Sequence, residues 1–263
     1  MRSIAEKMRL LQHNQRPNAN DIIKRIFPDC IEMHGDRLYG DDPSIIGGIS
    51  SLNGKPLTVI GQLRGRSLEE NIKYNFSMGH PEGFRKSLRL MKQAEKFSRP
   101  VVCFVDTMGA YPGVEAEERG QSAAIANNLM EMMMLEIPIF SVLIGYGGSG
   151  GALALAVANE IAMLENALLS VISPQGCAEI LWKDPKRYVE AADMMKMTAQ
   201  DMYDMGFADI LINEPEGGAH EDAGLMCERI KANLGALLEK YNHVSGHDAQ
   251  RMRYRKFRQV RPR

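Results

Sequence analysis

The chain has 263 residues, of which 44% are hydrophobic and 25% are charged, with 32 basic side chains against 33 acidic ones. This length supports one large domain or two small ones with a sizeable core, and the composition excludes a disordered chain. Because the charges balance, no overall field would draw the chain to nucleic acid or to anionic lipid. We expect a globular protein whose partners bind at local sites.

The cysteines and the first residues exclude two further classes. The four cysteines form no C-x-x-C pair, so neither a zinc ribbon nor a redox dithiol is predicted. Charged residues interrupt the first ten positions, which argues against a secretion signal. No run of about 18 apolar residues predicts a membrane-spanning helix. The sequence therefore predicts a cytoplasmic protein without a membrane anchor.

The first 30 residues predict a helical extension. A helix-like segment ends before Pro17, and Asn18 or Asn20 can cap a second short helix that runs toward Phe27. Both helices are interpreted as appendages to the core.

A hairpin and an amphipathic helix follow. The apolar segments 45–52 and 56–63 flank Asn53-Gly54, whose tolerance of positive φ suits a two-residue turn. Residues 82–97 then place apolar side chains at the 3.6-residue spacing of a helix, with basic residues between them.

From there strands and helices alternate. A strand is predicted at 101–105, followed by a glycine-rich loop and a helix from 117 to 135. A second strand is predicted at 138–144, followed by a second glycine-rich loop and a helix that ends at 158. Such alternation is typical of parallel βαβ units buried on both faces. The remaining predicted elements are short strands near 160–164, 168–172 and 209–212, a helix-rich stretch over 174–206, and a helix over 221–240. The basic segment RMRYRKFRQVRPR is interpreted as a solvated or partner-docking terminus, with a nucleic-acid arm as the alternative.

Two glycine-rich loops are the main candidates for chemistry. They are DTMGAYPG at 106–113 and IGYGGSGGALA at 144–154, and each follows a strand and opens a helix. The first amides of a helix lack intrahelical acceptors, so such loops suit a phosphate or a developing oxyanion. The alternative is that the glycines only let the strand turn tightly.

The second loop also fits two other templates. Gly145, Gly147 and Gly150 match the dinucleotide fingerprint, with Glu165 about twenty residues further on, but that fingerprint normally follows the first strand of a sheet. No Lys-Ser or Lys-Thr follows the glycines, which excludes a P-loop.

Ser149 stands at the centre of a G-x-S-x-G pattern, the nucleophile elbow of hydrolases. Asp209 and His220 follow it in the hydrolase order. They lie only eleven residues apart, however, and the glycines already explain the turn, so a hydrolase remains a distant alternative.

Charged residues elsewhere offer weaker candidates. His34 lies near Asp36, Asp41 and Asp42, but the spacing of zinc or calcium ligands is not met, which favours a capped turn. Arg64 and Arg66 follow the hairpin and suit either a nucleotide phosphate or a solvated strand end.

Six segments read together carry a family resemblance. In chain order they are HGDRLYGDDPSIIGGI, NFSMGHPEGFRKSLRLMKQAEKF, DTMGAYPGVEAEERGQS, GGSGGALALAVAN, SVISPQGCAEILWKD and EPEGGAH. Across roughly residues 15–220 the chain resembles the alpha subunit of bacterial acetyl-CoA carboxylase carboxyltransferase. The resemblance implies an α/β crotonase-like fold, a spiral of ββα units with peripheral helices. We expect that domain at 31–240, after the extension at 1–30 and before a basic C-terminal tail at 241–263.

The resemblance also implies a reaction and partners. Such a subunit transfers a carboxyl group from carboxybiotin, held on biotin carboxyl carrier protein, to acetyl-CoA, giving malonyl-CoA for fatty acid biosynthesis. It implies activity only with a beta subunit, in an alpha2beta2 heterotetramer whose active sites lie between the two chains. Biotin carboxylase belongs to the same ATP-dependent complex, and zinc is expected only on the beta subunit.

The resemblance places the site at the glycine loops. By motif match, the amides of Gly151 and Ala152 hold the biotin ureido oxygen, with Gly150 letting the backbone approach. The adjoining wall and substrate contacts are assigned to the residues around them, Gly109, Ala110, Tyr111, Pro112, Gly113, Tyr146, Gly147 and Gly148.

Three positions depart from the family pattern. Met108 replaces a Pro, Tyr146 replaces the Glu before GGSGG, and Gln175 replaces the Glu of an S-P-E-G segment. The loss of two carboxylates near the presumed site is expected to alter biotin docking or substrate choice. Two alternatives therefore stay open, a divergent paralogue that carboxylates or decarboxylates another acyl thioester, and a non-catalytic scaffold for the beta subunit.

Overall fold

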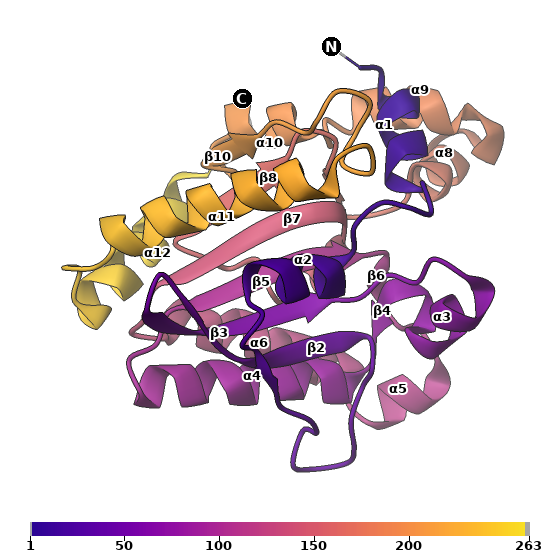
Figure 1. Ribbon diagram of the computed structural model, residues 1–263. Helices are drawn as coiled ribbons and strands as arrows, with labels where there is room; N and C mark the ends of the chain where they lie inside the picture. Colours follow the sequence, from indigo (N-terminus) through magenta and orange to yellow (C-terminus); the bar gives the residue numbers. More distant parts are fainter. Residues whose placement is uncertain (1, 261–263) are drawn as a thin grey trace.

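A mostly parallel β-sheet forms the centre of the computed structural model, which describes residues 2–260 (Figure 1). Its spatial order is β1-β2-β3-β5-β7-β8-β10, and β9 pairs with β7 beyond the end of β8. Every residue of β5 and β8 is buried, as expected for parallel strands covered on both faces. The strands of this sheet are β1 (Ile31–Glu32), β2 (Ile45–Leu52), β3 (Lys55–Gln62), β5 (Val101–Thr107), β7 (Ile139–Gly148), β8 (Glu160–Leu164), β9 (Leu168–Ser170) and β10 (Ile210–Ile212).

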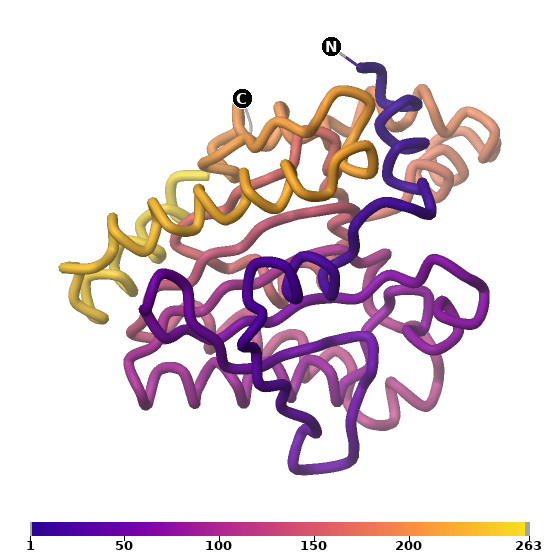
Figure 2. Tube along the Cα trace, in the orientation of Figure 1, coloured from indigo at the N-terminus to yellow at the C-terminus, as the bar shows by residue number. Residues whose placement is uncertain are grey.

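Helices cover the sheet on both sides. In Figure 1, α2 (Ala19–Ile26) and α11 (Ala223–Lys240) cross in front of the strands, while α4 (Pro81–Lys96) and α6 (Gln121–Met134) pack together on the other side of β2 and β3. The N-terminal helix α1 (Ile4–Leu11) lies beside α9 (Tyr188–Met194), as Figure 2 shows. The remaining elements are α3 (Leu68–Lys73), the 3-10 helices Asn75–Ser77 and Pro185–Arg187, β4 (Met78–Gly79), β6 (Gly109–Ala110), α5 (Val114–Glu118), α7 (Ser149–Leu153), α8 (Pro174–Trp182), α10 (Ala199–Asp204) and α12 (Gly246–Gln259).

The predicted hairpin is confirmed. Leu52 pairs with Lys55, so β2 and β3 are joined by the two residues Asn53 and Gly54. Both have positive φ, of 53° and 78°, which is the geometry this dipeptide favours. The alternation of strands and helices after residue 100 is confirmed as well.

Some boundaries differ from the sequence prediction. The single helix expected from 117 to 135 is two helices, α5 and α6, because Gly120 has a φ of 82° and breaks the helical path. The helix expected through Ala158 ends at Leu153, and buried turns follow it.

The C-terminal segment differs from a solvated tail. Residues 246–259 form α12, and Arg253 on this helix has no exposed surface. Its guanidinium donates to the carbonyls of Leu135 and Ile137 and, at 2.6 Å, to Asn159 Oδ1. Burial lowers the pKa of Arg253 to about 10. The buried role of Arg253 cannot be recognised in a sequence rich in basic residues, because the carbonyl groups that Arg253 binds are brought to it only by the fold.

Arg253→Met is expected to destabilise the protein. The substitution leaves the carbonyls of Leu135 and Ile137 without the donor they share, and each orphaned buried group costs about 1–3 kcal/mol. Asn159 Oδ1 loses one of its two donors and keeps the Ile139 N–H. Urea denaturation would measure the loss. The matched control is Arg255→Met on the exposed side of the same helix, expected to change stability by less than about 0.5 kcal/mol. Equal effects for the two variants would contradict an anchoring role for Arg253.

No helix within residues 2–260 has both the length and the apolar character needed to cross a membrane.

Candidate functional site

The ladder between β5 and β7 slips at its carboxyl end. Val105 pairs with Leu143, but Thr107 pairs with Gly147, so β7 has two extra residues at this point. Before this bulge β7 pairs with β8, and after it Tyr146 pairs with Leu168 of β9. At the bulge β7 therefore exchanges its neighbour β8 for β9 while it stays paired with β5, and α7 begins directly after the last of these pairs.

The two glycine-rich loops touch through their backbones. A Cβ on Gly148 would lie 2.3 Å from the carbonyl carbon of Met108, and one on Gly151 would lie 2.6 Å from that of Gly109. Contacts this short exclude any side chain at either glycine. Gln62 further fixes this junction by donating from Nε2 to the Gly151 carbonyl at 2.8 Å. The structure thus joins two loops that the sequence could only identify separately.

The start of α7 presents backbone amides. Gly148 is its N-cap and provides no side-chain capping bond. In a helix the first amides lack intrahelical acceptors, and here they belong to Ser149, Gly150 and Gly151. Gly150 is half-buried and Gly151 is buried. Ala152, whose amide the resemblance also assigns to the ureido oxygen, is buried in the same turn. The first turn of α7 is irregular, since Ser149 has a φ of 48°.

An uncharged cavity of about 130 Å³ adjoins this turn. Gly147, Gly148 and Ser149 line it on one side, and residues 170–175 line it on the other. Met108, Tyr146 and Gln175, the three departures from the family pattern, all line this one cavity. Every other lining side chain is also uncharged. The departures are therefore clustered, and they determine the polarity of the space beside the α7 amides.

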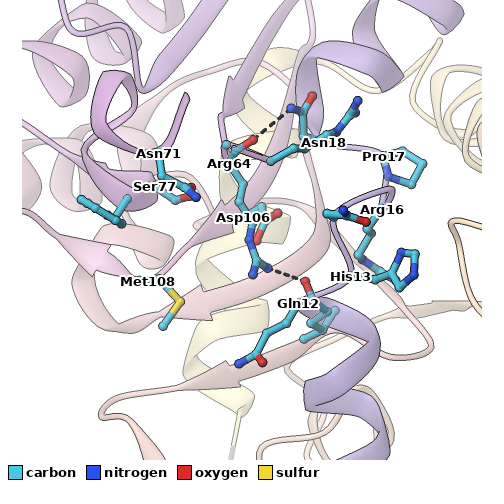
Figure 3. Close-up of a pocket in the computed structure, with 15 residues that line it drawn as sticks. Gln12, His13, Arg16, Pro17, Asn18, Arg64, Asn71, Ser77, Asp106 and Met108 are labelled. Carbon is cyan, nitrogen blue, oxygen red and sulfur yellow. Dashed lines mark hydrogen bonds between the residues drawn. The ribbon is translucent and has the colours of Figure 1, made fainter. Parts of the chain in front are cut away.

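A second cavity, of about 260 Å³, is lined by arginines (Figure 3). It shares Gln12 and Met108 with the first cavity. Arg64 donates from Nη1 to the Leu11 carbonyl at 2.5 Å, and its guanidinium lies 5.4 Å from the centre of the Tyr146 ring. Arg66 forms an ion pair with Asp21. Both arginines proposed from the sequence thus line a cavity, but each already has a protein partner.

Asp106 is a candidate that sequence reasoning missed. It lies near the carboxyl end of β5, only 4% exposed, and its Oδ1 accepts the Tyr146 N–H at 2.9 Å. Burial raises the pKa of Asp106, against the opposing effect of Arg64 and Arg16. The signal in the sequence was an acid directly after the apolar strand VVCFV, since ligands and functional groups gather at the carboxyl ends of parallel strands.

Comparisons with known proteins identify the family. A family model described as acetyl co-enzyme A carboxylase carboxyltransferase-like matches residues 3–261. The acetyl-coenzyme A carboxylase carboxyl transferase subunit alpha of Staphylococcus carnosus is 52% identical over 97% of this chain and 81% of its own length. That of Clostridium acetobutylicum is 52% identical over 97% of this chain and 93% of its own length. The chain belongs to this carboxyltransferase alpha-subunit family. The resemblance found in the sequence is thereby confirmed, and the chain is a transferase subunit.

Solved structures support the fold expected of an alpha subunit. Transcarboxylase 12S superposes with a TM-score of 0.71 at 16% identity, covering 90% of this chain and 44% of that chain. The beta subunit of geranyl-CoA carboxylase from P. aeruginosa gives 0.67 at 15% identity, covering 91% and 45%. This alpha-subunit family member spans less than half of either solved chain. The likeness concerns the fold, and the predicted crotonase-like α/β fold is confirmed.

The wall residues assigned to the alpha subunit divide into two groups. Gly109 and Ala110 form β6 and lie against Gly151. The Tyr111 ring packs at 4.3 Å on His80, and Gly113 is the N-cap of α5. Residues 111–113, including the exposed Pro112, continue toward α5, and none of residues 109–113 lines the uncharged cavity.

The hydrolase alternative does not fit this geometry. Asp209 accepts the Ile161 N–H at 2.7 Å and pairs with Lys256, while His220 stacks on His13 with ring centres 3.8 Å apart. The two partners that Ser149 needs are thus engaged with other residues and not with each other. The acid of the dinucleotide template is also engaged elsewhere, since Glu165 accepts the Glu214 N–H at 3.2 Å.

The acidic segment around His34 forms a turn. Asp36 accepts hydrogen bonds from the amides of Leu38, Tyr39 and Gly40. Burial alone would raise the pKa of Asp36, but these bonds and the hydrogen bond from Arg85 outweigh it and lower the pKa to about 2. His34 Nδ1 lies 3.0 Å from Asp41. Within residues 2–260 no group of three or more acidic, His or Cys side chains is arranged to hold a metal ion.

Proposed function

We propose that this chain is the alpha subunit of an acetyl-CoA carboxylase carboxyltransferase. It transfers a carboxyl group from carboxybiotin, held on biotin carboxyl carrier protein, to acetyl-CoA, and the product is malonyl-CoA. The observation that carries the proposal, beside family membership, is the start of α7: Gly148 and Ser149 line an uncharged cavity, and the next two amides of this turn belong to Gly150 and Gly151. They belong to loops that glycine alone allows to meet.

The chain's own part in this reaction is electrostatic. Bound biotin supplies the transferable carboxyl group and, once that group has left, carries negative charge on its ureido oxygen. The amides of Gly150 and Gly151 would donate to that oxygen, and the missing side chains of Gly148 and Gly151 let the two loops pack closely enough to fix the turn. A donor fixed in this way is worth roughly 3–4 kcal/mol in other enzymes. Because amides do not titrate, this stabilisation is independent of pH.

The composition of the cavity fits a neutral ring. Its wall contains Met8, Met108 and Met197, whose flexible thioethers adapt to irregular apolar shapes. The amide of Gln175 offers hydrogen bonds without charge. The lining residues include no cation, so negative charge on the carboxylated ring or on its ureido oxygen would be stabilised by backbone amides and neutral dipoles.

The clustered departures favour one second candidate, a divergent paralogue that acts on another acyl thioester. Met108, Tyr146 and Gln175 all line the cavity beside the amides, so they alter the site without altering the fold. The wider arrangement then stays the same, and only the acyl group or the direction of the reaction differs.

The active unit is proposed to include a beta subunit, in an alpha2beta2 heterotetramer that is cytoplasmic. The beta subunit supplies the donors for the thioester and any zinc, and biotin carboxylase and the carrier protein complete the complex. Two observations support a partner. Apolar side chains near the cavity are exposed, Val171 by 79% and Met108 by 54%. A related fold is described as a malonate decarboxylase MdcD–MdcE hetero-dimer.

Co-expression with candidate beta chains tests the proposal. The purified complex is supplied with carboxylated carrier protein and acetyl-CoA, and malonyl-CoA is measured, with each chain alone as the control. The proposal expects malonyl-CoA from the complex and none from either chain. Assembly without any carboxyl transfer would support the scaffold alternative, and transfer only to another thioester would support the paralogue.

A further inference from the structure

Two buried charged side chains hold the bulge in β7. The bulge releases the Ile144 carbonyl and the Tyr146 N–H from the ladder with β5. The Tyr146 N–H donates to Asp106 Oδ1 at 2.9 Å. The Ile144 carbonyl accepts from Arg16 Nη2 at 2.8 Å and from its Nε at 3.3 Å. Buried backbone groups without partners are costly, so these two side chains take the place of the missing strand pairs.

Both side chains are themselves fixed. Arg16 makes two hydrogen bonds to Glu214, at 2.6 Å and 2.8 Å, and both residues are buried. Asp106 packs directly against Gly145, where a Cβ would lie 2.2 Å from Oδ1. The carboxylate therefore occupies the volume that any other residue at position 145 would fill. Figure 3 shows Asp106 and Arg16 on the wall of the arginine-lined cavity.

The bulge lies directly before the proposed site. Gly147 and Gly148 follow Tyr146, and α7 begins at Ser149. At Tyr146 the strand also changes its neighbour from β8 to β9. A shift in the bulge would therefore move the amides of Gly150 and Gly151 relative to β6, whose Gly109 backbone lies against Gly151.

We propose that Asp106 is a positioning residue for carboxyl transfer. It fixes the path of β7 through the Tyr146 amide and so aims the amides at the start of α7, while Arg16 acts on the same bulge through the Ile144 carbonyl. The inference rests on the proposed function. Asp106 lines the arginine-lined cavity and not the uncharged one beside the amides, so it acts through the backbone and does not touch the transferred group.

Kinetics of the assembled complex test this role. Asp106→Ala removes the acceptor and is expected to lower kcat about 100-fold, the effect of displacing a catalytic group by roughly 1 Å, with the KM for acetyl-CoA changed less than about threefold. Asp106→Asn keeps an acceptor oxygen and is expected to stay within about fivefold of the unsubstituted protein. Should the alanine variant fail to assemble, Asp106→Leu fills the same space without an acceptor and is expected to show the same loss of kcat.

The matched control is Asp209→Ala. Asp209 also accepts a strand amide, that of Ile161 at 2.7 Å, but at the opposite end of the sheet. Its removal is expected to leave kcat per assembled complex unchanged. Hydrogen exchange adds a readout besides activity: the Tyr146 amide should exchange faster in Asp106→Ala and at the ordinary rate in Asp209→Ala.

The inference is overturned if assembled Asp106→Ala keeps its kcat within twofold, or if Asp209→Ala loses as much. Gly151→Ala in the same assay separates this failure from failure of the proposed function. If Gly151→Ala is inactive while Asp106→Ala is fully active, the amides act without help from Asp106. If Gly151→Ala is also active, the proposed site itself is wrong.

Discussion

Gly151→Ala is expected to lower the kcat of the assembled carboxyltransferase by at least about 100-fold. The added Cβ would lie 2.6 Å from the Gly109 carbonyl carbon and 2.8 Å from its oxygen. Both are backbone atoms and cannot rotate away, so α7 and β6 must separate. Loss of one oxyanion donor costs about 100-fold to 1,000-fold in other enzymes. Initial rates of malonyl-CoA formation, normalised to assembled complex, would measure the effect.

Gly40→Ala is the control for that substitution. A Cβ on Gly40 would have no heavy atom within 4 Å, and this loop is distant in sequence from the glycine-rich loops. We expect its kcat to equal that of the unsubstituted chain. Full activity of Gly151→Ala in an intact complex would show that carboxyl transfer does not need the contact between the two loops and that the proposed site is wrong.

Arg16→Ala is expected to reduce the free energy of unfolding by about 3–5 kcal/mol, the usual cost of breaking a buried ion pair. The side chains of Arg16 and Glu214 are only 5% and 0% exposed, and their closest contact is 2.6 Å. The substitution leaves Glu214 as a buried charge without its cation, and it leaves the Ile144 carbonyl without a donor. Urea denaturation of the chain monitored by circular dichroism would measure the change.

The effect should also depend on pH. Burial alone would raise the pKa of Glu214, but the hydrogen bonds and the positive charge of Arg16 outweigh burial and lower this pKa from its ordinary 4.5. A lowered pKa contributes stability that is present above pH 4.5 and is lost as the pH falls through the folded value. The stability difference between the unsubstituted chain and Arg16→Ala should therefore shrink on acidification below pH 4.5. A difference that grows in acid would contradict this account of the pair.

The exposed pair of Lys55 and Glu239 provides the comparison. Its atoms lie 2.9 Å apart, but the side chains are 30% and 67% exposed. Solvent screens such a pair, so Lys55→Ala is expected to cost less than about 1 kcal/mol. If Arg16→Ala were no more costly than Lys55→Ala, the N-terminal segment would not be anchored through Glu214.

Local patterns predicted much of the fold. Asn53-Gly54 marked the hairpin because its backbone preference is a property of two adjacent residues. The alternation after residue 100 marked the parallel strands, since burial on both faces leaves continuous apolar runs. Arg253 was not predictable in this way, because its partners, the carbonyls near residue 136 and the amide of Asn159, come from distant parts of the chain.

The site was predictable only in part. The glycines predicted two tight loops. The contact between these loops depends on the order of the strands in the sheet, which cannot be read from single residues. The bulge in β7 left no sequence pattern, and so the roles of Asp106 and Arg16 were missed. The three departures, spread over residues 108–175, gathered at one cavity only once the fold placed them together.

The most direct measurement is a structure of this chain, assembled with its beta subunit, with biotin bound. The account predicts the ureido oxygen about 2.7–3.1 Å from the amide nitrogen of Gly151 or Gly150, the distance of an oxyanion-hole donor. A ring oxygen bound elsewhere, with both amides donating to protein acceptors, would contradict the claim that these amides hold its negative charge.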